Sequence, residues 1–261
     1  MSFQVLFGAG GLAGWNLLKR TAAQQKQMVA ADPVVTRSTA YFRDNIAKTG
    51  QAADLVSDYR LLSVTLGAFG LEADVASKAF IRKILESPQS DEKSLVNRLA
   101  DKRYLRLANA FGYDLGNQTV TSDGFADRIT QAYLDREFER RVGEGDQNLR
   151  LALNAQRELS QMAGRDSTED TLWFEVMGNP PLRRVFEQAF GFSSSYGKLP
   201  IDRQLAEFKE KAETVFGSSS FDVITTEKGT EKLIQRFLLQ SQLSEGMAAS
   251  SYSIALQLLR N

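Results

Sequence analysis

The chain has 261 residues, in which 32 lysines and arginines balance 32 aspartates and glutamates, and it contains neither histidine nor cysteine. Without these two residue types there is no Ser-His or Cys-His nucleophile pair, no zinc finger and no disulfide scaffold. Its 43% hydrophobic and 25% charged residues are typical of a globular protein. The zero formal charge disfavours broad electrostatic capture of nucleic acid or of an acidic membrane.

Two kinds of membrane-related segment are not predicted. The first residues lack the basic and then apolar layout of a secretory signal, so no cleavable signal peptide is expected. No unbroken apolar stretch reaches about 18 residues, the length that would predict a membrane span.

Apolar residues recur at spacings of three and four along most of the chain, which predicts an all-α protein made of one multi-helix body. We expect a glycine-rich N-terminal arm with the first helix over residues 1–35, then helical halves over 36–165 and 166–261. No linker rich in Pro, Gly and Ser separates them, which favours one continuous domain. Three helical faces are Phe80, Ile84 and Leu85; Leu149, Leu153, Gln156 and Leu159; and Leu233, Ile234, Phe237 and Leu238. Two strand-like segments, residues 3–7 and 221–225, are too few for a sheet.

Helix ends are marked by capping patterns. Asp166 followed by Glu169 is spaced as in a capping box, and Asn179 stands before Pro180 as a cap before a first-turn proline. Asp101 and Asp202 are further candidate starts. The tripeptide Ala-Phe-Gly occurs at residues 68–70, 110–112 and 189–191, each time ending a helical pattern. Since glycine adopts the left-handed conformation past a helix end, we predict three helix stops there.

A longer echo surrounds the first and third stops. Phe42 and Phe174 each lie ahead of a stop, and Phe80 and Phe208 each lie in the helix that follows. An old, degraded internal duplication and coincidence among helical sequences explain this pattern equally well.

The N-terminal segment carries the most specific enzymatic pattern. Gly8, Gly11 and Gly14 follow a strand-like run and precede a helical one, as in the GxxGxxG of dinucleotide-binding dehydrogenases. An NAD(P)-binding oxidoreductase would also need a second parallel strand ending near Asp32 and a Tyr-x-x-x-Lys pair. Residues 21–31 are polar and helical instead, and no tyrosine has a lysine four positions later. A flexible apolar arm leading into the first helix is the alternative interpretation.

Other chemical patterns are weaker. The S-x-x-K spacing of serine acylating enzymes occurs twice, at Ser90 and Ser195, without the accompanying elements. Carboxylates gather at Glu137 and Glu139, where neighbouring arginines predict a solvated, ion-paired helix face. Those of residues 166–170 are explained by helix capping. We therefore expect no catalytic residue, no cofactor and no metal.

Both chain ends carry apolar helical faces, although ends are usually polar and frayed. Such faces either dock on the protein's own core or bind a partner protein. The candidate partner-binding residues are Leu12, Trp15, Leu18, Tyr252, Leu256 and Leu259.

Eight sequence blocks occur together along the chain, at residues 11–15, 18–21, 41–46, 58–62, 68–71, 99–104, 178–183 and 255–259. Taken together they resemble a bacterial family of unknown function whose genes are commonly found in flagellar clusters. The resemblance covers nearly the whole chain. It implies a helical, non-enzymatic protein connected with the bacterial flagellum, and it supplies no catalytic residues.

We therefore expect a structural or interaction protein of flagellar assembly or function, bound to a flagellar component and not to nucleic acid. Its expected place is a bacterial cytoplasm or the flagellum itself. The alternatives are a cytoplasmic export chaperone or adaptor, which would bind an unassembled flagellar subunit, and the oxidoreductase that would use Gly8, Gly11 and Gly14.

Overall fold

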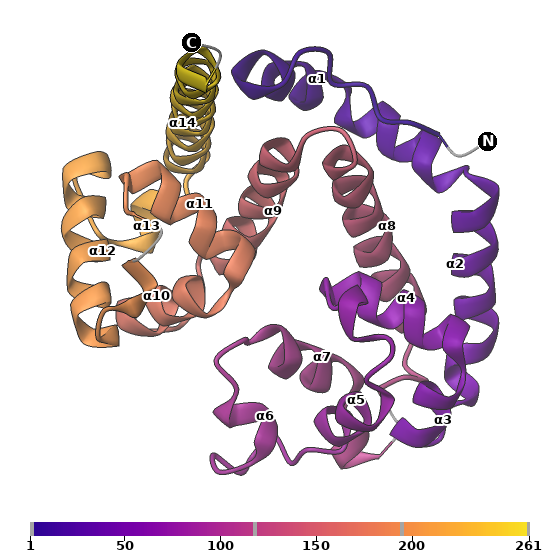
Figure 1. Cartoon of the computed structure of the whole chain (residues 1–261). Helices are drawn as coiled ribbons and strands as arrows, with labels where there is room; N and C mark the ends of the chain where they lie inside the picture. The colour runs from indigo at the N-terminus through magenta and orange to yellow at the C-terminus, as the bar shows by residue number, and fades with distance from the viewer. Residues whose placement is uncertain (1–2, 117–118, 194–195, 260–261) are drawn as a thin grey trace. The chain divides into compact units, whose positions relative to one another are not determined.

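A computed structural model describes the backbone of residues 3–116, 119–193 and 196–259, with side chains described as far as residue 246. Within these ranges the chain forms α-helices and short 3-10 turns and contains no strand (Figure 1). The predicted all-α class is confirmed. No helix in this part of the chain is both long and apolar enough to cross a membrane.

The helices pack into two compact units, and each is described by itself. The first comprises Met1–Leu6 and Arg20–Arg141, and the second comprises Phe7–Lys19 and Val142–Asn261. The division expected at residue 165 falls inside the second unit, after α9 (Gln147–Met162). This helix packs on α11 (Pro180–Phe190) and α14 (Glu227–Leu259), so the helices on both sides of that point share one core.

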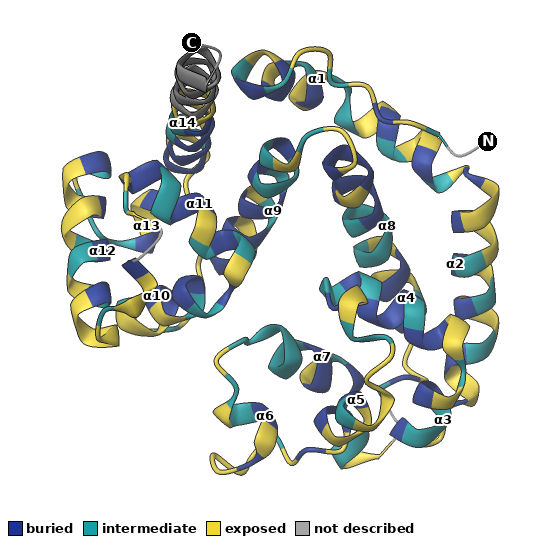
Figure 2. Cartoon of the chain, viewed as in Figure 1, coloured by how far each residue is buried: buried dark blue, intermediate teal, exposed yellow. Residues whose placement is uncertain are grey.

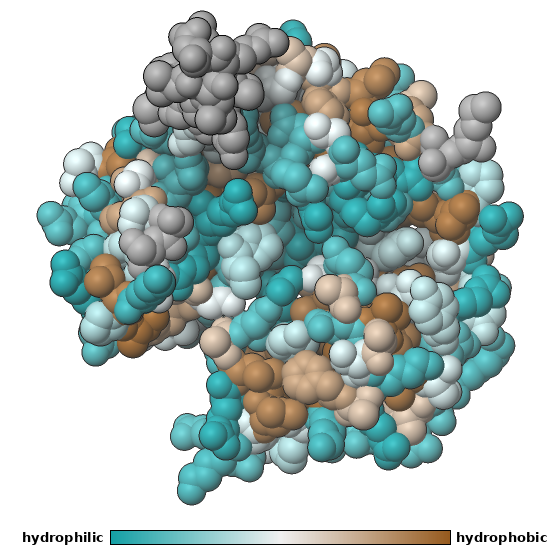
Figure 3. Space-filling view, in the orientation of Figure 1, coloured by the Kyte–Doolittle hydropathy of each residue, from teal (hydrophilic) through white to brown (hydrophobic). Residues whose placement is uncertain are grey.

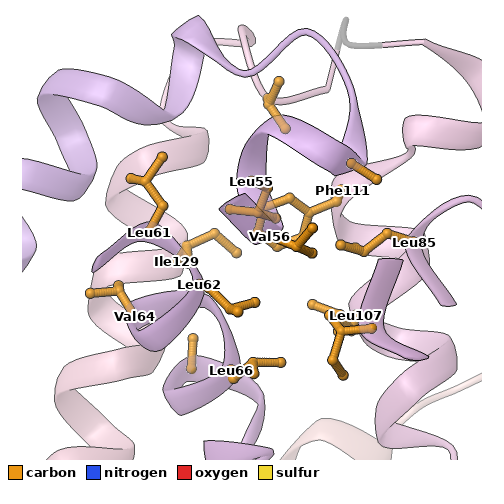
Figure 4. Close-up of a cluster of buried hydrophobic side chains, with 14 of the residues drawn as sticks. Leu55, Val56, Leu61, Leu62, Val64, Leu66, Leu85, Leu107, Phe111 and Ile129 are labelled. Carbon is orange, nitrogen blue, oxygen red and sulfur yellow. The ribbon is translucent and has the colours of Figure 1, made fainter. Parts of the chain in front are cut away.

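The first unit buries a core of aliphatic and aromatic side chains. Leucines and valines from four helices converge on Phe111 and Ile129 (Figure 4). The core stabilises the unit because each fully buried side chain of this size contributes about 1.5–3 kcal/mol relative to exposure. Beyond the shared α1 (Gly11–Ala30), its helices are α2 (Pro33–Asn45), α3 (Ala52–Ser57), α4 (Tyr59–Phe69), α5 (Lys78–Leu85), α6 (Leu95–Arg98), α7 (Arg103–Phe111) and α8 (Phe125–Gly143), with turns η1 (Ile46–Lys48), η2 (Glu72–Asp74) and η3 (Tyr113–Leu115).

The second unit is built around aromatic rings. The Trp173 ring meets those of Phe186, Phe208 and Phe221 at centroid distances of 5.5, 5.9 and 4.9 Å in edge-to-face geometry. The Trp173 indole N–H donates to the Ser219 carbonyl at 3.1 Å, so its polar edge is satisfied. These rings join α10 (Glu169–Gly178), α11, α12 (Ile201–Phe216) and α13 (Phe221–Ile224), and the unit also contains α9, α14 and turn η4 (Tyr196–Lys198).

All three predicted glycine stops are confirmed. Gly70, Gly112 and Gly191 cap α4, α7 and α11 with φ of +70°, +62° and +74°. After α4 and α11 the following residue donates back across the last turn, from Leu71 to Leu66 and from Phe192 to Glu187, which makes two Schellman motifs. Gly112 makes the simpler single bond to Ala108, at 2.8 Å.

Of the two predicted helix caps at Asn179 and Asp166, the first is confirmed and the second is wrong. Asn179 accepts from the Leu182 N–H and caps α11 before Pro180, as expected. The expected capping box at Asp166 is wrong, because Thr168 caps α10 two residues later. Glu169 instead accepts from the Ser220 hydroxyl and the Phe221 N–H, at 2.8 and 3.0 Å.

Neither of the two strand-like segments forms a β-strand. Residues 221–224 form helix α13, whose first turn is capped by Ser220. Residues 3–8 have no regular secondary structure, because side chains rather than a neighbouring strand bind their backbone. Short apolar runs are compatible with either element, and the local pattern cannot separate them.

The predicted helical faces differ in accuracy. All four predicted positions of α14, residues 233, 234, 237 and 238, are buried (Figure 2). In α9 the face is rotated, with Leu149 and Leu159 buried and Gln156 exposed. The proposed duplication equates Phe42, which is buried in α2, with Phe174, whose side chain is 41% exposed in α10. The two positions therefore do not have equivalent surroundings.

Candidate functional site

The N-terminal arm, defined here as residues 3–6, is held through its backbone in the first unit. The Phe3 N–H donates to the Asp32 carboxylate at 3.3 Å, and the Phe3 carbonyl accepts from the Arg141 guanidinium at 3.0 Å. At Leu6 the Gln25 side-chain amide makes both bonds, accepting from the N–H and donating to the carbonyl at 2.7 Å each. Four main-chain groups of the arm are thus satisfied by three side chains.

Two of these side chains, Asp32 and Arg141, belong to a charged cluster with Glu137 and Arg140. Arg141 donates to Asp32 at 3.1 Å and to Glu137 at 2.8 Å, and Arg140 also donates to Glu137 at 2.8 Å. Hydrogen bonds from the Val34 N–H, which contributes most, from Arg141 and from the Phe3 N–H lower the pKa of Asp32 to about 2. Burial acts in the opposite direction but is outweighed. Burial raises the pKa of Glu137, but hydrogen bonds from Arg140 and Arg141 outweigh it and leave that pKa lowered. All members are therefore charged at neutral pH.

The predicted ion pairing at Glu137 and Glu139 is confirmed, but the predicted exposure of this face to solvent is wrong. Both side chains are buried, because α8 turns this face inward within the first unit. Asp32, near which a dinucleotide-binding fold would need a second strand to end, is instead the N-cap of α2 and a partner of the arm. Among the described residues no group of three or more acidic side chains is placed to hold a metal ion.

The glycine-rich segment packs against its own unit. A Cβ on Gly11 would lie 2.1 Å from the Gln242 amide, and one on Gly14 would lie 2.7 Å from the Ala9 carbonyl oxygen. Gly8 and Gly11 have φ of +66° and +64°. These glycines allow the backbone to turn and to approach α14 and the start of α1 closely.

The arrangement that the dinucleotide-binding alternative requires is not seen among the described residues. It requires a strand before the glycines and a parallel sheet after them, and the described part of the chain contains no strand. An open groove of about 620 Å³ does border the segment. Its lining residues are Ala9, Gly10, Gly11, Gly145, Asp146, Gln147, Asn148, Arg184, Leu238, Gln242 and Glu245.

The N-terminal candidate residues lie inside the fold. Trp15 and Leu18 are fully buried, and Leu12 is half-buried. The Trp15 indole N–H donates to Glu231 of α14 at 3.1 Å, and Lys19 donates to the same carboxylate at 2.7 Å. Burial raises the pKa of Glu231, but bonds from Lys19, Gln235 and Trp15 leave it lowered. This face of α1 therefore docks on the protein itself.

A second open groove lies beside this contact. Its volume is about 710 Å³, and polar side chains of α1, α9 and α14 line it, with Lys19 and Glu231 among them. Lys228 and Lys232, one turn apart on α14, also line it. Charges of both signs face this groove.

The C-terminal candidate residues lie on the long helix α14. Tyr252, Leu256 and Leu259 fall within its backbone range, but their side chains lie outside the described residues. Earlier in the helix, Leu239 and Leu243 are 47% and 60% exposed, one turn apart. The helix thus carries an exposed apolar pair opposite its buried face.

Hydrophobic side chains also reach the surface of the first unit over α6 and α7, among hydrophilic ones (Figure 3). Leu95 of α6 and Leu115 of η3 are both exposed. Of the two S-x-x-K matches, Ser90 lies in an exposed turn and Ser195 lies outside the described residues.

Comparison with known proteins places the chain in a family. Residues 68–228 match the model of a protein family of unknown function, DUF1217. The chain belongs to the DUF1217 family. A crystal structure of protein AGR_C_984 from Agrobacterium tumefaciens is similar, with a TM-score of 0.74 and 23% identity over 92% of this chain and 99% of that chain. This likeness shows a shared fold. No curated protein matches the chain.

In this DUF1217 protein the arm contacts were missed by sequence reasoning. Gln25 and Arg141 lie in helical patterns like those of many surface residues, and no local signal marks them as buried. Asp32 before Pro33 does have the spacing of a helix cap, and that signal could have been found. The matched region of the family model includes Arg141 but neither the arm nor Asp32.

Proposed function

We propose that this DUF1217 protein is a non-enzymatic structural or interaction component of the bacterial flagellum, which acts through helical surfaces. The resemblance of its sequence blocks to a family encoded in flagellar clusters supports the flagellar connection. The observation that carries the binding role is the exposed pair Leu239 and Leu243 on α14.

This pair has the geometry of a helix-in-groove contact. Leu233, Ile234, Phe237 and Leu238 anchor the same helix in its own core, so the opposite face is presented on a fixed support. Two exposed leucines one turn apart have the spacing of the anchor residues by which an amphipathic helix binds in a hydrophobic groove. We therefore propose a protein partner with an apolar groove for α14.

The test replaces both leucines by serine in the full chain. Leu239→Ser with Leu243→Ser should abolish co-purification of flagellar components and leave the melting temperature nearly unchanged, because both side chains are already exposed. The matched control is Lys228→Ser with Lys232→Ser, another exposed pair one turn apart on α14, which should retain the partners. Equal partner recovery from both double variants would refute a role for the leucine pair.

Location tests the flagellar part of the proposal. Tagged protein in purified basal bodies or filaments would support a structural component. Tagged protein confined to the cytoplasm with an unassembled subunit would support the export chaperone or adaptor. Tagged protein associated with neither would refute the flagellar assignment.

A further inference from the structure

The arm is bound as an extended peptide in a slot, defined here by Gln25, Asp32 and Arg141. Gln25 lies in α1, and Asp32 lies two residues beyond the end of that helix. Residues 3–6 form no helix or turn, and Phe3 bonds to Asp32 while Leu6 bonds to Gln25. The arm therefore runs antiparallel to the end of α1, within the first unit.

Recognition in this slot depends mainly on the backbone. All four bonds described above go to main-chain N–H and C=O groups of Phe3 and Leu6. Val5 is the arm residue with a buried side chain, at 3% exposure, whereas the Leu6 side chain is 68% exposed. Binding through main-chain groups with one apolar anchor is how proteins commonly hold extended peptides.

An empty slot would be costly. Gln25, Asp32 and Arg141 are all buried, and without the arm they would lose the main-chain partners that satisfy them. A buried polar group without a partner keeps the full cost of its desolvation. The slot therefore favours an occupant whenever its own arm is displaced.

We propose that this slot binds the N-terminal arm of a second copy of the chain, so that neighbouring copies exchange arms. The arm of another copy offers the same backbone groups and the same Val5 anchor, and the zero net charge places no long-range repulsion between copies. The chain's own arm competes for the slot at an effective concentration of the order of millimolar, because it is tethered beside it. The arm of a second copy can therefore replace it where copies are packed at a comparable local concentration. This inference does not depend on the flagellar assignment.

The first test uses a matched pair of full-length variants. Leu6→Pro removes the N–H that donates a hydrogen bond to Gln25. Leu6→Ala keeps that N–H and removes only an exposed side chain. The probe is a fluorescent peptide of residues 1–7 with an amidated end, followed by anisotropy at up to about 1 mM unlabelled competitor. The Leu6→Pro chain should bind it about tenfold more tightly than the Leu6→Ala chain, since its own arm competes less well.

A second variant is needed in case Leu6→Pro leaves the arm partly bound in the slot. A chain without residues 1–6 has no competing arm and should bind the peptide more tightly still, with one site per chain. A peptide carrying Val5→Asp should not bind, because the buried anchor becomes a charge. Circular dichroism and melting temperature identify which of the two chains is folded and suitable for the measurement.

Exchange between copies is measured by native mass spectrometry. A chain with Gln25→Ala has a weakened slot and donates its arm, and the Leu6→Pro chain accepts it. Their mixture should form a heterodimer that is depleted when the donor also carries Leu6→Pro. Failure of the folded Leu6→Pro and truncated chains to bind the peptide, or a heterodimer insensitive to the donor arm, would overturn the proposal.

Discussion

Single residues in the charged cluster differ sharply in how much they contribute to stability. Arg140 and Arg141 both bind Glu137, but the Arg140 side chain is 43% exposed and that of Arg141 is 5% exposed. Water screens an exposed pair, whereas removal of one buried partner leaves the others charged and unpaired. The same type of bond to the same carboxylate therefore has different consequences.

Arg141→Ala should lower the free energy of unfolding by about 3–5 kcal/mol, because Asp32 and Glu137 remain buried without their shared cation. The control Arg140→Ala should cost less than about 1 kcal/mol. Urea unfolding followed by circular dichroism measures both. Equal losses from the two variants would mean that the burial of Arg141 is not decisive.

Asp32 gives the protein a defined acid sensitivity. Its pKa falls from 3.8 in the unfolded chain to about 2 in the folded one, so the folded state favours the charged form. The stabilisation is complete above pH 3.8 and is lost as the pH falls through about 2. Unfolding titrations should show this slope, and the Asp32→Asn variant, although less stable, should have a flatter profile over that window.

At the scale of elements, the glycine caps share a backbone conformation but not their surroundings. Gly70 and Gly191 have φ of +70° and +74°, and each ends a helix. A Cβ on Gly191 would meet nothing within 4 Å, whereas one on Gly70 would lie 2.8 Å from the Arg136 guanidinium. The helix stop is local, and the cost of altering it depends on the packing.

Gly191→Ala should cost about 1–2 kcal/mol, the strain of a left-handed residue with a Cβ. Gly70→Ala should cost more, since Arg136 must also move. Gly191→Asn should be milder than Gly191→Ala, because asparagine tolerates this conformation better. Thermal unfolding of the three variants tests the order, and a Gly191→Ala loss as large as that of Gly70→Ala would contradict it.

At the scale of the whole molecule, the chain has one unit with a mainly aliphatic core and one built on aromatic rings. Phe208 joins the aromatic cluster through Trp173, Phe186 and Phe190, at centroid distances of 5.9, 6.5 and 5.9 Å. It is fully buried. Phe174 is adjacent to Trp173 in sequence, but its side chain is partly exposed to solvent whereas that of Trp173 is buried.

Phe208→Ala should destabilise the second unit by about 3–5 kcal/mol, the usual cost of deleting a buried phenylalanine. Phe174→Ala should cost much less, because that side chain is already 41% exposed. Both tryptophans, Trp15 and Trp173, belong to this unit, so their fluorescence follows its unfolding. Similar midpoints for the two variants would contradict the assigned role of Phe208.

The sequence by itself determined the features that depend on neighbouring residues. The all-α class, the buried face of α14, the cap at Asn179 and the three glycine stops all follow from spacing or from backbone conformation within a few residues. Such signals are local, and tertiary contacts did not override them.

Only the tertiary structure decided which polar groups meet. Arg141 reaches Asp32 across 109 positions of sequence, and it reaches Phe3 across 138. A charge at these positions looks the same in the sequence whether water or another buried charge surrounds it. Packing of α8 on the arm and the end of α1 removes the water, and it thereby turns an apparently solvated helix face into a slot for the N-terminal arm.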